Sequence, residues 1–259
     1  MPLTITNTLD RLGHYTLRIC DTVGSFVLFL KGAGVQLITT SIDTKKLIQQ
    51  IDQIGIASIN IVVLTGTFTG MVFALQSYIG FSRMGGEQFI GTVVALGMAR
   101  ELGPVLTGLM VTGRAGSAMA AELGTMRISE QIDALWTLRI NTFSYLIVPR
   151  ILASIIVLPC LSLFATCCGI LGGYFVVVYA LNLSAEQYIS SITQFVNLAD
   201  VFGGLTKASV FGLLLSWAGC FKGYTASGGA RGVGKATTQA VVLGSILILM
   251  INYVLTKVL

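Results

Sequence analysis

The segment GTVVALGMARELGPVLTGLMV, from Gly91 to Val111, is apolar except for one adjacent charged pair, Arg100 and Glu101. About 20 apolar residues cross the hydrocarbon core of a bilayer as a helix. Ionisable side chains inside a bilayer are costly, so they usually face the interior of a helical bundle or a water-filled cavity. The segment therefore predicts a membrane-spanning helix with a polar feature inside the protein, as in a transport component.

The composition of the whole chain favours the same class of protein. Of its 259 residues, 54% are hydrophobic and only 10% are charged, whereas soluble domains carry about 25% charged residues. The 30 glycines suit close helix packing in a membrane. The net charge of +5 comes from residues spread along the chain without a basic run, which favours membrane anchoring over nucleic-acid binding. We therefore expect an all-α polytopic membrane protein with no nucleic-acid partner.

The cysteines and the histidine do not form the pattern of a metal or redox site. None of the five cysteines belongs to a CxxC motif, and most lie in apolar stretches, which is typical of buried thiols. His14 is the only histidine, so a transition-metal site is not expected. The sequence predicts neither a metal ion nor a cofactor bound to this chain.

Residues 1–53 are predicted to form an N-terminal interfacial amphipathic region. Between residues 8 and 30, apolar and polar side chains recur on different sides of a helix, which is typical of a helix in the membrane interface. The apolar set is Leu9, Leu12, Ile19, Val23, Phe26 and Leu30, and the polar set is Asp10, His14, Arg18, Asp21 and Ser25. A signal peptide fits less well, because the apolar run Phe26–Leu30 is short. Residues 39–53 are polar and are expected on the cytoplasmic side.

Residues 54–259 are predicted to form a transmembrane domain of about five helices. The expected spans are residues 54–80, 88–113, 151–181, 201–221 and 238–256. Positively charged loop residues favour the cytoplasmic side. The predicted loops on that side contain Arg114, Arg127, Arg139, Arg150, Lys222, Arg231 and Lys235, whereas those on the other side contain Arg83 and Lys207. The pattern predicts a cytoplasmic N-terminus and an external C-terminus.

Two glycine motifs need separate interpretation. Gly66 and Gly70 have the GxxxG spacing that lets two helices approach closely. Gly229 to Lys235 match the G-x-x-x-x-G-K core of a phosphate-binding loop, but Ala236 stands where that loop needs Ser or Thr. A membrane span precedes this second motif, so we expect a flexible cytoplasmic turn there rather than a nucleotide site.

Arg100 and Glu101 are expected near the middle of the membrane. If the second span begins near Gln88, Arg100 lies roughly 18 Å deep, in a hydrocarbon core about 30 Å thick. Adjacent residues point about 100° apart on a helix, so the two charges are expected to meet different partners. They either hold helices together or form a polar feature at a lumen or subunit interface. Gly103-Pro104 is expected to bend the helix after them.

The segment from Glu122 to Trp136 is too charged to span a membrane. Its Ser129–Asp133 part fits a helix start, and one apolar face is expected from Leu123, Met126, Ile132, Leu135 and Trp136. The segment is either an interfacial loop helix or a docking helix for a cytoplasmic partner. In the second case Glu122, Arg127 and Glu130 would set the register with that partner.

Four blocks of sequence, in order along the chain, resemble the MlaE permease family. They are GMVFALQ (Gly70–Gln76), ARELGPV (Ala99–Val105), GRAGS (Gly113–Ser117) and AELGTM (Ala121–Met126). The resemblance extends from about residue 50 to the C-terminus and is most specific over residues 66–136. It implies the permease subunit of an ATP-driven ABC transporter that moves phospholipids or related lipids between the inner membrane and the outer envelope.

The resemblance also implies the assembly around the chain. The chain would form a homodimer, bind cytoplasmic ABC ATPase subunits that hold ATP and Mg, and lie beneath an MCE-domain substrate-binding protein. A small STAS-type protein would be a further accessory partner. The chain itself would be a non-catalytic, multi-pass subunit of the bacterial inner (cytoplasmic) membrane, in contact with membrane lipids.

Two sets of functional residues follow from the resemblance. A coupling segment at about residues 121–136 would receive the ATPase stroke, with Glu122, Met126, Arg127, Glu130 and Asp133. A lipid cavity at the dimer interface would be bordered by Leu75, Gln76, Tyr78, Arg100, Glu101 and Leu102. Such a cavity needs apolar walls with a few polar groups. Arg100 would meet a phosphate or pair structurally, and Gln76 and Tyr78 would supply neutral hydrogen bonds.

Two other classes of function are distinguishable from this one. A secondary transporter of an amphipathic substrate, driven by an ion gradient, would explain the buried pair without partner chains. Such transporters often contain internal repeats, and the sequence shows none. A membrane-embedded enzyme is disfavoured, because His14 lies outside the predicted spans and no Ser/His or paired-carboxylate site can be assembled from them.

Overall fold

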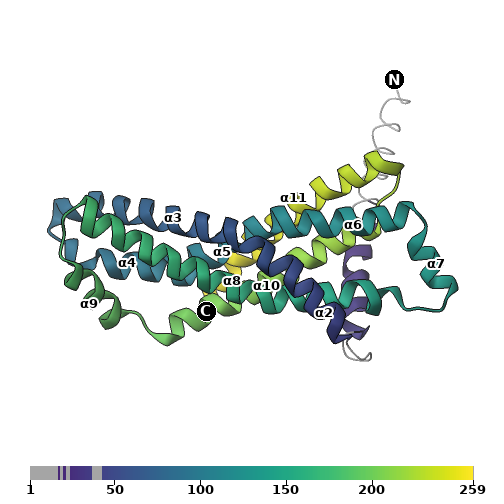
Figure 1. The fold of residues 1–259 in the computed structure, drawn as a ribbon, viewed down its shortest axis with the longest axis horizontal. Helices are drawn as coiled ribbons and strands as arrows, with labels where there is room; N and C mark the ends of the chain where they lie inside the picture. Colours follow the sequence, from purple (N-terminus) through teal and green to yellow (C-terminus); the bar gives the residue numbers. More distant parts are fainter. Residues whose placement is uncertain (1–16, 18–19, 22–23, 37–42, 259) are drawn as a thin grey trace, which may run out of the picture.

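The computed structural model describes residues 17, 20–21, 24–36 and 43–258 of the chain. Among these residues the structure is helical, with short turns and no strand. Five of the helices are long and apolar enough to cross a membrane: Thr44–Phe81, Glu87–Ile128, Phe143–Ala180, Leu198–Tyr224 and Gly229–Val258. This confirms the predicted all-α membrane fold with about five transmembrane helices (Figure 1). The cytoplasmic N-terminus and external C-terminus stay a prediction.

Several of the long helices are built from α-helical pieces joined by π-helical turns. The first contains α2 (Thr44–Ile51) and α3 (Ala57–Phe81); the second contains α4 (Ile90–Gly97), α5 (Gly103–Val111) and α6 (Ser117–Ile128); the third contains α8 (Val148–Phe175); the last two are α10 (Leu198–Tyr224) and α11 (Gly229–Val258). Two short helices, α7 (Gln131–Thr137) and α9 (Ala185–Phe195), lie in the connections. The π-helical turns cover Asp52–Ile56, Met98–Leu102, Thr112–Gly116, Phe143–Ile147 and Val176–Ala180.

The helices extend beyond the predicted spans at the side assigned to the cytoplasm. The first helix begins at Thr44 and runs through the predicted domain boundary at residue 53, the second continues to Ile128, and the third begins at Phe143. The second helix has 42 residues and is therefore about 63 Å long, twice the thickness of the hydrocarbon core. The charged end of this helix, up to Ile128, lies beyond its apolar part. Outside the hydrocarbon core, charged side chains do not oppose helix formation.

The predicted turn over Lys222–Lys235 is also mostly helical. Only residues 225–228 separate α10 from α11, and Gly228 and Gly229 make the turn with φ of 92° and 68°. Val233 then packs against Gly124 of α6. A Cβ added to Gly124 would lie 3.5 Å from a methyl carbon of Val233. The segment that matches a phosphate-binding loop thus lies on a packed helix, so its backbone is not arranged as a loop.

Close packing of glycines holds α3 against α8. Gly66 faces Ala165 and Gly70 faces Gly169, so the two helices run in the same direction. A Cβ on Gly70 would lie only 1.9 Å from the carbonyl oxygen of Gly169. The close helix approach predicted from the GxxxG spacing is therefore confirmed, and it occurs within one chain. Pro159 lies inside α8, which continues through it.

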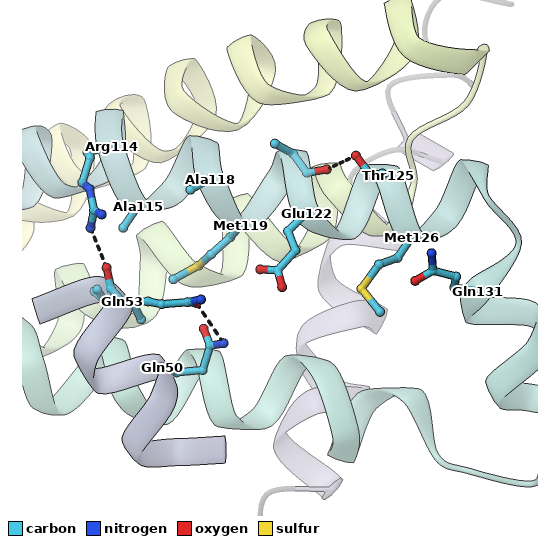
Figure 2. Close-up of a pocket in the computed structure, with 12 residues that line it drawn as sticks. Gln50, Gln53, Arg114, Ala115, Ala118, Met119, Glu122, Thr125, Met126 and Gln131 are labelled. Carbon is cyan, nitrogen blue, oxygen red and sulfur yellow. Dashed lines mark hydrogen bonds between the residues drawn. The ribbon is translucent and has the colours of Figure 1, made fainter. Parts of the chain in front are cut away.

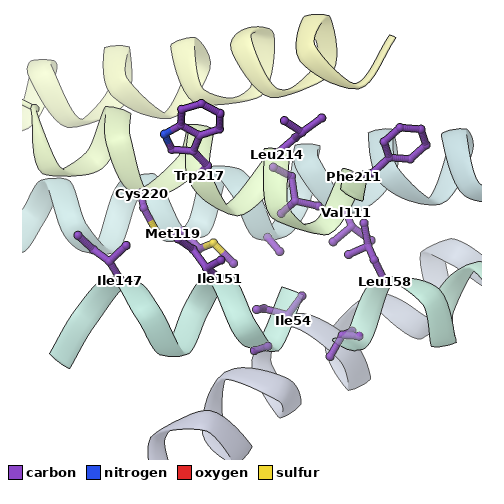
Figure 3. Packing of buried hydrophobic residues seen from close by; sticks show 14 of the residues in the cluster. Ile54, Val111, Met119, Ile147, Ile151, Leu158, Phe211, Leu214, Trp217 and Cys220 are labelled. Atoms are coloured by element: carbon purple, nitrogen blue, oxygen red, sulfur yellow. The ribbon is translucent and has the colours of Figure 1, made fainter. Parts of the chain in front are cut away.

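The main hydrophobic core lies where α8, α6 and α10 meet (Figure 3). The N-terminal helix of residues 24–36 joins this core through Phe26, which stacks on Trp217 with ring centroids 3.9 Å apart. Phe29 lies beside Phe143 and Phe221. In Figure 1 this purple helix lies across the long axis of the bundle. Of the predicted amphipathic face, Leu9, Leu12, Ile19 and Val23 lie outside the described residues, as do Asp10, His14 and Arg18.

A second, smaller core packs α9 against α4 at the other end of the bundle. Its buried members include Ile90, Val94 and Tyr188. The Tyr188 hydroxyl donates to the carbonyl of Ile170 at 3.1 Å. Burial raises the pKa of this hydroxyl above its ordinary value, so it remains a donor at physiological pH.

The expectation of buried thiols is wrong for three of the cysteines. Cys220 is buried and Cys168 is half-buried, but Cys20, Cys160 and Cys167 are exposed, and all five are free. Cys160 and Cys167 lie on the outer surface of α8, because an apolar span allows a thiol to face lipid as well as the core.

We predict opposite effects for two alanine substitutions on α3. Gly70→Ala places a Cβ against the Gly169 backbone, which cannot move aside as a flexible side chain can, and overpacking of this kind costs about 1–3 kcal/mol or more. Gly80→Ala meets nothing within 4 Å and gains up to about 1 kcal/mol of helix propensity. Thermal unfolding of the two variants in detergent measures the difference. Equal melting temperatures would contradict the close backbone contact between α3 and α8.

Candidate functional site

The charged pair lies in the π-helical turn Met98–Leu102, inside the second long helix. Arg100 pairs with Asp200 of α10, with Nη1 and Oδ1 3.6 Å apart. Glu101 instead pairs with Lys207, also on α10, with Oε1 and Nζ 2.5 Å apart. The prediction that the two charges have different partners is therefore confirmed. Single π-helical turns within α-helices, such as this one, often occur at functional sites.

Glu101 is the centre of a polar cluster that joins three spans. Its carboxylate also accepts hydrogen bonds from Thr256 at 3.1 and 3.2 Å and from Asn252 at 3.3 Å, both on α11. The Lys207 side chain is only 4% exposed, and it donates to Thr256 at 2.9 Å as well. This cluster fixes the second, fourth and fifth long helices to one another.

Pro104 explains why Lys207 has a backbone partner too. Proline lacks an N–H group, so the carbonyl four residues earlier loses its helical donor. That carbonyl belongs to Arg100, and it accepts a hydrogen bond from Lys207 Nζ at 3.2 Å. A π-helical turn directly precedes Gly103-Pro104, and in it the Gly103 N–H bonds to the Met98 carbonyl. The bend expected after the charged pair stays a prediction.

Sequence reasoning missed Lys207 as a partner, because it counted this residue with the external loops although the predicted span of residues 201–221 contains it. The structure places Lys207 in the interior of α10 and buries it. Gly204 allows this arrangement, since a Cβ there would lie 2.0 Å from the Ala99 carbonyl oxygen. A single lysine within the apolar span of residues 201–221 was the available signal.

A shallow apolar hollow of about 500 Å³ opens on the outer face of α3. Its lining is Phe68, Thr69, Val72, Phe73, Gln76 and Leu102. Two of the six predicted cavity residues, Gln76 and Leu102, lie here. Leu75 is 43% exposed on the same helix, and Tyr78 packs against the second core.

The other two predicted cavity residues lie apart from this hollow in the single chain. Arg100 lines a separate hollow of about 80 Å³ with Asp200 and Lys207. Glu101 turns toward α10 and α11 through its hydrogen bonds to Lys207 and Asn252. Of the six residues, the structure thus brings only Gln76 and Leu102 together in one hollow.

The segment predicted for coupling, residues 121–136, consists of the end of α6, a turn and α7. Glu130 makes the turn with φ of 59° and is exposed. Arg127 and Asp133 pair across it at 2.6 Å. Leu123 and Ile132 are buried and Met126 and Leu135 pack on the main core, but Trp136 is 63% exposed, so its predicted place on the apolar face is wrong.

Glu122, predicted to contact a partner, has a partner within the chain. Its Oε2 lies 2.8 Å from Nη2 of Arg150, whose side chain is 4% exposed. Arg150 also donates to the Leu146 carbonyl at 2.5 Å. The prediction of a loop at Arg150 is wrong, because this residue belongs to α8 and is buried there. The ion pair joins α6 to the first turn of α8.

A groove of about 820 Å³ with both polar and apolar lining residues separates α2 from α6 (Figure 2). Glu122 and Met126 face it from α6, and Gln50 and Gln53 from the first long helix. Arg114 crosses one end, where it donates to the Gln53 carbonyl at 2.5 Å and to Ser58 at 3.2 Å. The groove therefore lies beside the segment predicted for coupling.

Comparison with known proteins gives consistent matches over almost the whole chain. The family described as Permease MlaE matches residues 47–258. A probable ABC transporter permease protein of Rickettsia conorii is 47% identical over 97% of both chains. One from Synechocystis is 39% identical over 88% of this chain and 87% of its own. The chloroplastic protein trigalactosyldiacylglycerol 1 of Arabidopsis thaliana is 37% identical over 86% of this chain and 64% of its own length.

Proposed function

Because the chain belongs to the MlaE permease family and is an ABC transporter permease, we propose that it moves phospholipids or related lipids between the inner membrane and the outer envelope. The observation that carries this proposal is the apolar hollow on α3, whose lining includes Leu102, the residue that follows Glu101 of the polar cluster. A lipid needs apolar walls for its chains and a few polar groups for its head. The name of the Arabidopsis relative, which contains that of a galactolipid, supports a lipid substrate.

In this proposal a second copy of the chain completes the lipid site. The α3 face that carries the hollow is apolar and exposed, with Leu64, Phe68 and Val72 each more than half exposed. A homodimer that pairs these faces would turn two shallow hollows into one enclosed cavity. A cavity formed this way would lie between two copies of the Met98–Leu102 turn.

The energy would come from separate ATPase subunits that hold ATP and Mg and dock on the α6–α7 segment. The long helix Glu87–Ile128 carries both Glu101 and the α6 part of this segment. A displacement at α6 would reach the cluster along one helix, and the π-helical turns at Met98–Leu102 and Thr112–Gly116 are the places where that helix can deform. ATP hydrolysis would then shift the population between two arrangements of the cavity.

The proposed setting is the bacterial inner membrane, with an MCE-domain protein on the outer side and a small STAS-type protein as a further partner. Mass spectrometry of what co-purifies with the tagged chain from its native membrane in mild detergent tests this assembly. An ABC ATPase, an MCE-domain protein and retained phospholipid are expected. Recovery of the chain without an ATPase, together with transport that stops when an ion gradient collapses, would favour the gradient-driven alternative.

Two tryptophan substitutions test the hollow itself. Val72 lines the hollow and is 57% exposed, whereas Val242 is 53% exposed on α11 and lies outside both the lining and the α3 face. Val72→Trp is expected to fill the space and lower both the phospholipid retained and the lipid transport rate about tenfold, a loss of about 1.4 kcal/mol. Val242→Trp is the matched control and should leave both near the wild-type values. Equal values for the two variants would remove the hollow from the transport path.

A further inference from the structure

A different hollow, of about 430 Å³, lies between the N-terminal helix and the return from α7 to the third long helix. Gly32 and Gln36 line it from the N-terminal helix, Trp136 and Arg139 from the end of α7, and Asn141 and Phe143 from the start of the third helix. It lies apart from both the hollow on α3 and the groove beside α6. The proposed lipid cavity uses none of these side chains, and Trp136 alone belongs also to the segment predicted for coupling.

The fold places this hollow at a membrane boundary. The N-terminal helix crosses the bundle axis (Figure 1), as a helix lying on a membrane surface does. Its Phe26 contacts Trp217, which is about 10 residues, or about 15 Å, along α10 from Lys207. Half of the hydrocarbon thickness is about 15 Å. The sequence predicts Arg100 near the membrane centre, and Lys207 donates to its carbonyl. With this level at the centre, the N-terminal helix lies at the depth of the lipid headgroups.

The charges around the hollow favour an anion. Arg139 lines it, Lys31 precedes the lining residue Gly32 in the sequence, and both side chains are exposed. Neither forms an ion pair with a residue that the structure describes. No carboxylate is among the described lining residues. The long helix Phe143–Ala180 also begins here, and a helix N-terminus carries partial positive charge.

The rim of the hollow is apolar, which distinguishes a lipid from a free anion. Trp136 is 63% exposed, Leu138 68% and Ile140 37%. A tryptophan and aliphatic side chains beside a basic residue are typical of the membrane–water interface. An anionic headgroup with acyl chains satisfies both sets of groups, the cations and the apolar rim.

We infer that this hollow binds an anionic phospholipid of the leaflet in which the N-terminal helix lies. The phosphate lies near Arg139 and Lys31, and the start of the acyl chains lies against Trp136. The bound lipid holds the end of α7 to the N-terminal helix and so fixes the position of the α6–α7 segment relative to the membrane. This site is separate from the proposed transport cavity and does not depend on which substrate is transported.

The chain contains only two tryptophans, so Trp217→Phe leaves Trp136 as the single fluorophore and keeps a ring to stack on Phe26. The full-length Trp217→Phe chain is placed in nanodiscs that contain phosphatidylglycerol or phosphatidylcholine, each brominated near the carboxyl end of its acyl chains. Phosphatidylglycerol is expected to quench Trp136 more strongly. The selectivity is the ratio of Trp136 quenching by phosphatidylglycerol to that by phosphatidylcholine. Arg139→Gln should lower it about fivefold, which is the effect of one basic side chain near an anionic surface.

Two further variants keep the test decisive. Arg139→Lys should retain most of the selectivity because it keeps the charge, and Arg83→Gln, at the other end of the bundle, should leave it unchanged. Equal quenching by the two lipids, or unchanged selectivity in Arg139→Gln, would overturn the inference. If Arg139→Gln instead loses an ATPase partner in pulldown while its lipid selectivity is intact, the surface docks protein rather than lipid.

Discussion

Glu101→Ala is expected to destabilise the protein by about 3–5 kcal/mol, because it leaves the buried Lys207 ammonium without its carboxylate. Glu101 also joins α10 and α11 to the second long helix, so its loss affects the contacts among three spans. Thermal unfolding in detergent is the measurement, and Glu186→Ala, an exposed carboxylate on α9, is the control with an effect below about 0.5 kcal/mol.

A double substitution separates the charge from the packing. Adding Lys207→Met to Glu101→Ala removes the orphaned ammonium and should restore part of the lost stability. Restoration should be incomplete, because the Arg100 carbonyl then lacks its donor, at about 1–3 kcal/mol. If the double variant is less stable than Glu101→Ala, Lys207 is not held by Glu101 in the way described.

The membrane fold follows from sequence because its physical cause is local. Apolar length and the scarcity of charge require helices in lipid, so the number of spans and the GxxxG contact at Gly66 and Gly70 could be predicted. Helix ends could not, since the end of α6 carries Glu122 and Arg127, which look like loop residues when a span is assumed to stop at the bilayer. The structure shows that the helix continues to Ile128.

The polar partners could be predicted only in part, because they depend on which helices lie side by side. The different partners of Arg100 and Glu101 follow from helix geometry, but nothing local identifies Lys207, Asn252 and Thr256 as neighbours of Glu101 across more than 100 residues. The bond from Lys207 to the Arg100 carbonyl is an intermediate case. Pro104 shows from sequence that this carbonyl loses its donor, whereas the replacement donor appears only in the fold.

The same limit applies to the coupling segment, and two charge reversals there are expected to differ. Glu122→Lys sets a cation against the buried Arg150 guanidinium, and loss of a buried partner costs about 3–5 kcal/mol. Glu130→Lys changes an exposed side chain in the α6–α7 turn that forms no ion pair with a described residue, so stability should change by less than about 0.5 kcal/mol. Thermal unfolding and capture of the ATPase subunit are measured on both variants.

The comparison decides whether the α6–α7 segment docks the ATPase, because only Glu130→Lys probes docking without disturbing the fold. Weaker capture by Glu130→Lys at wild-type stability would support docking at this turn. Weaker capture by Glu122→Lys alone, together with a lower melting temperature, would instead reflect a loosened contact between α6 and α8. Wild-type stability of Glu122→Lys would show that Arg150 does not depend on this carboxylate, and Glu122 would then return to the set of residues available to the partner.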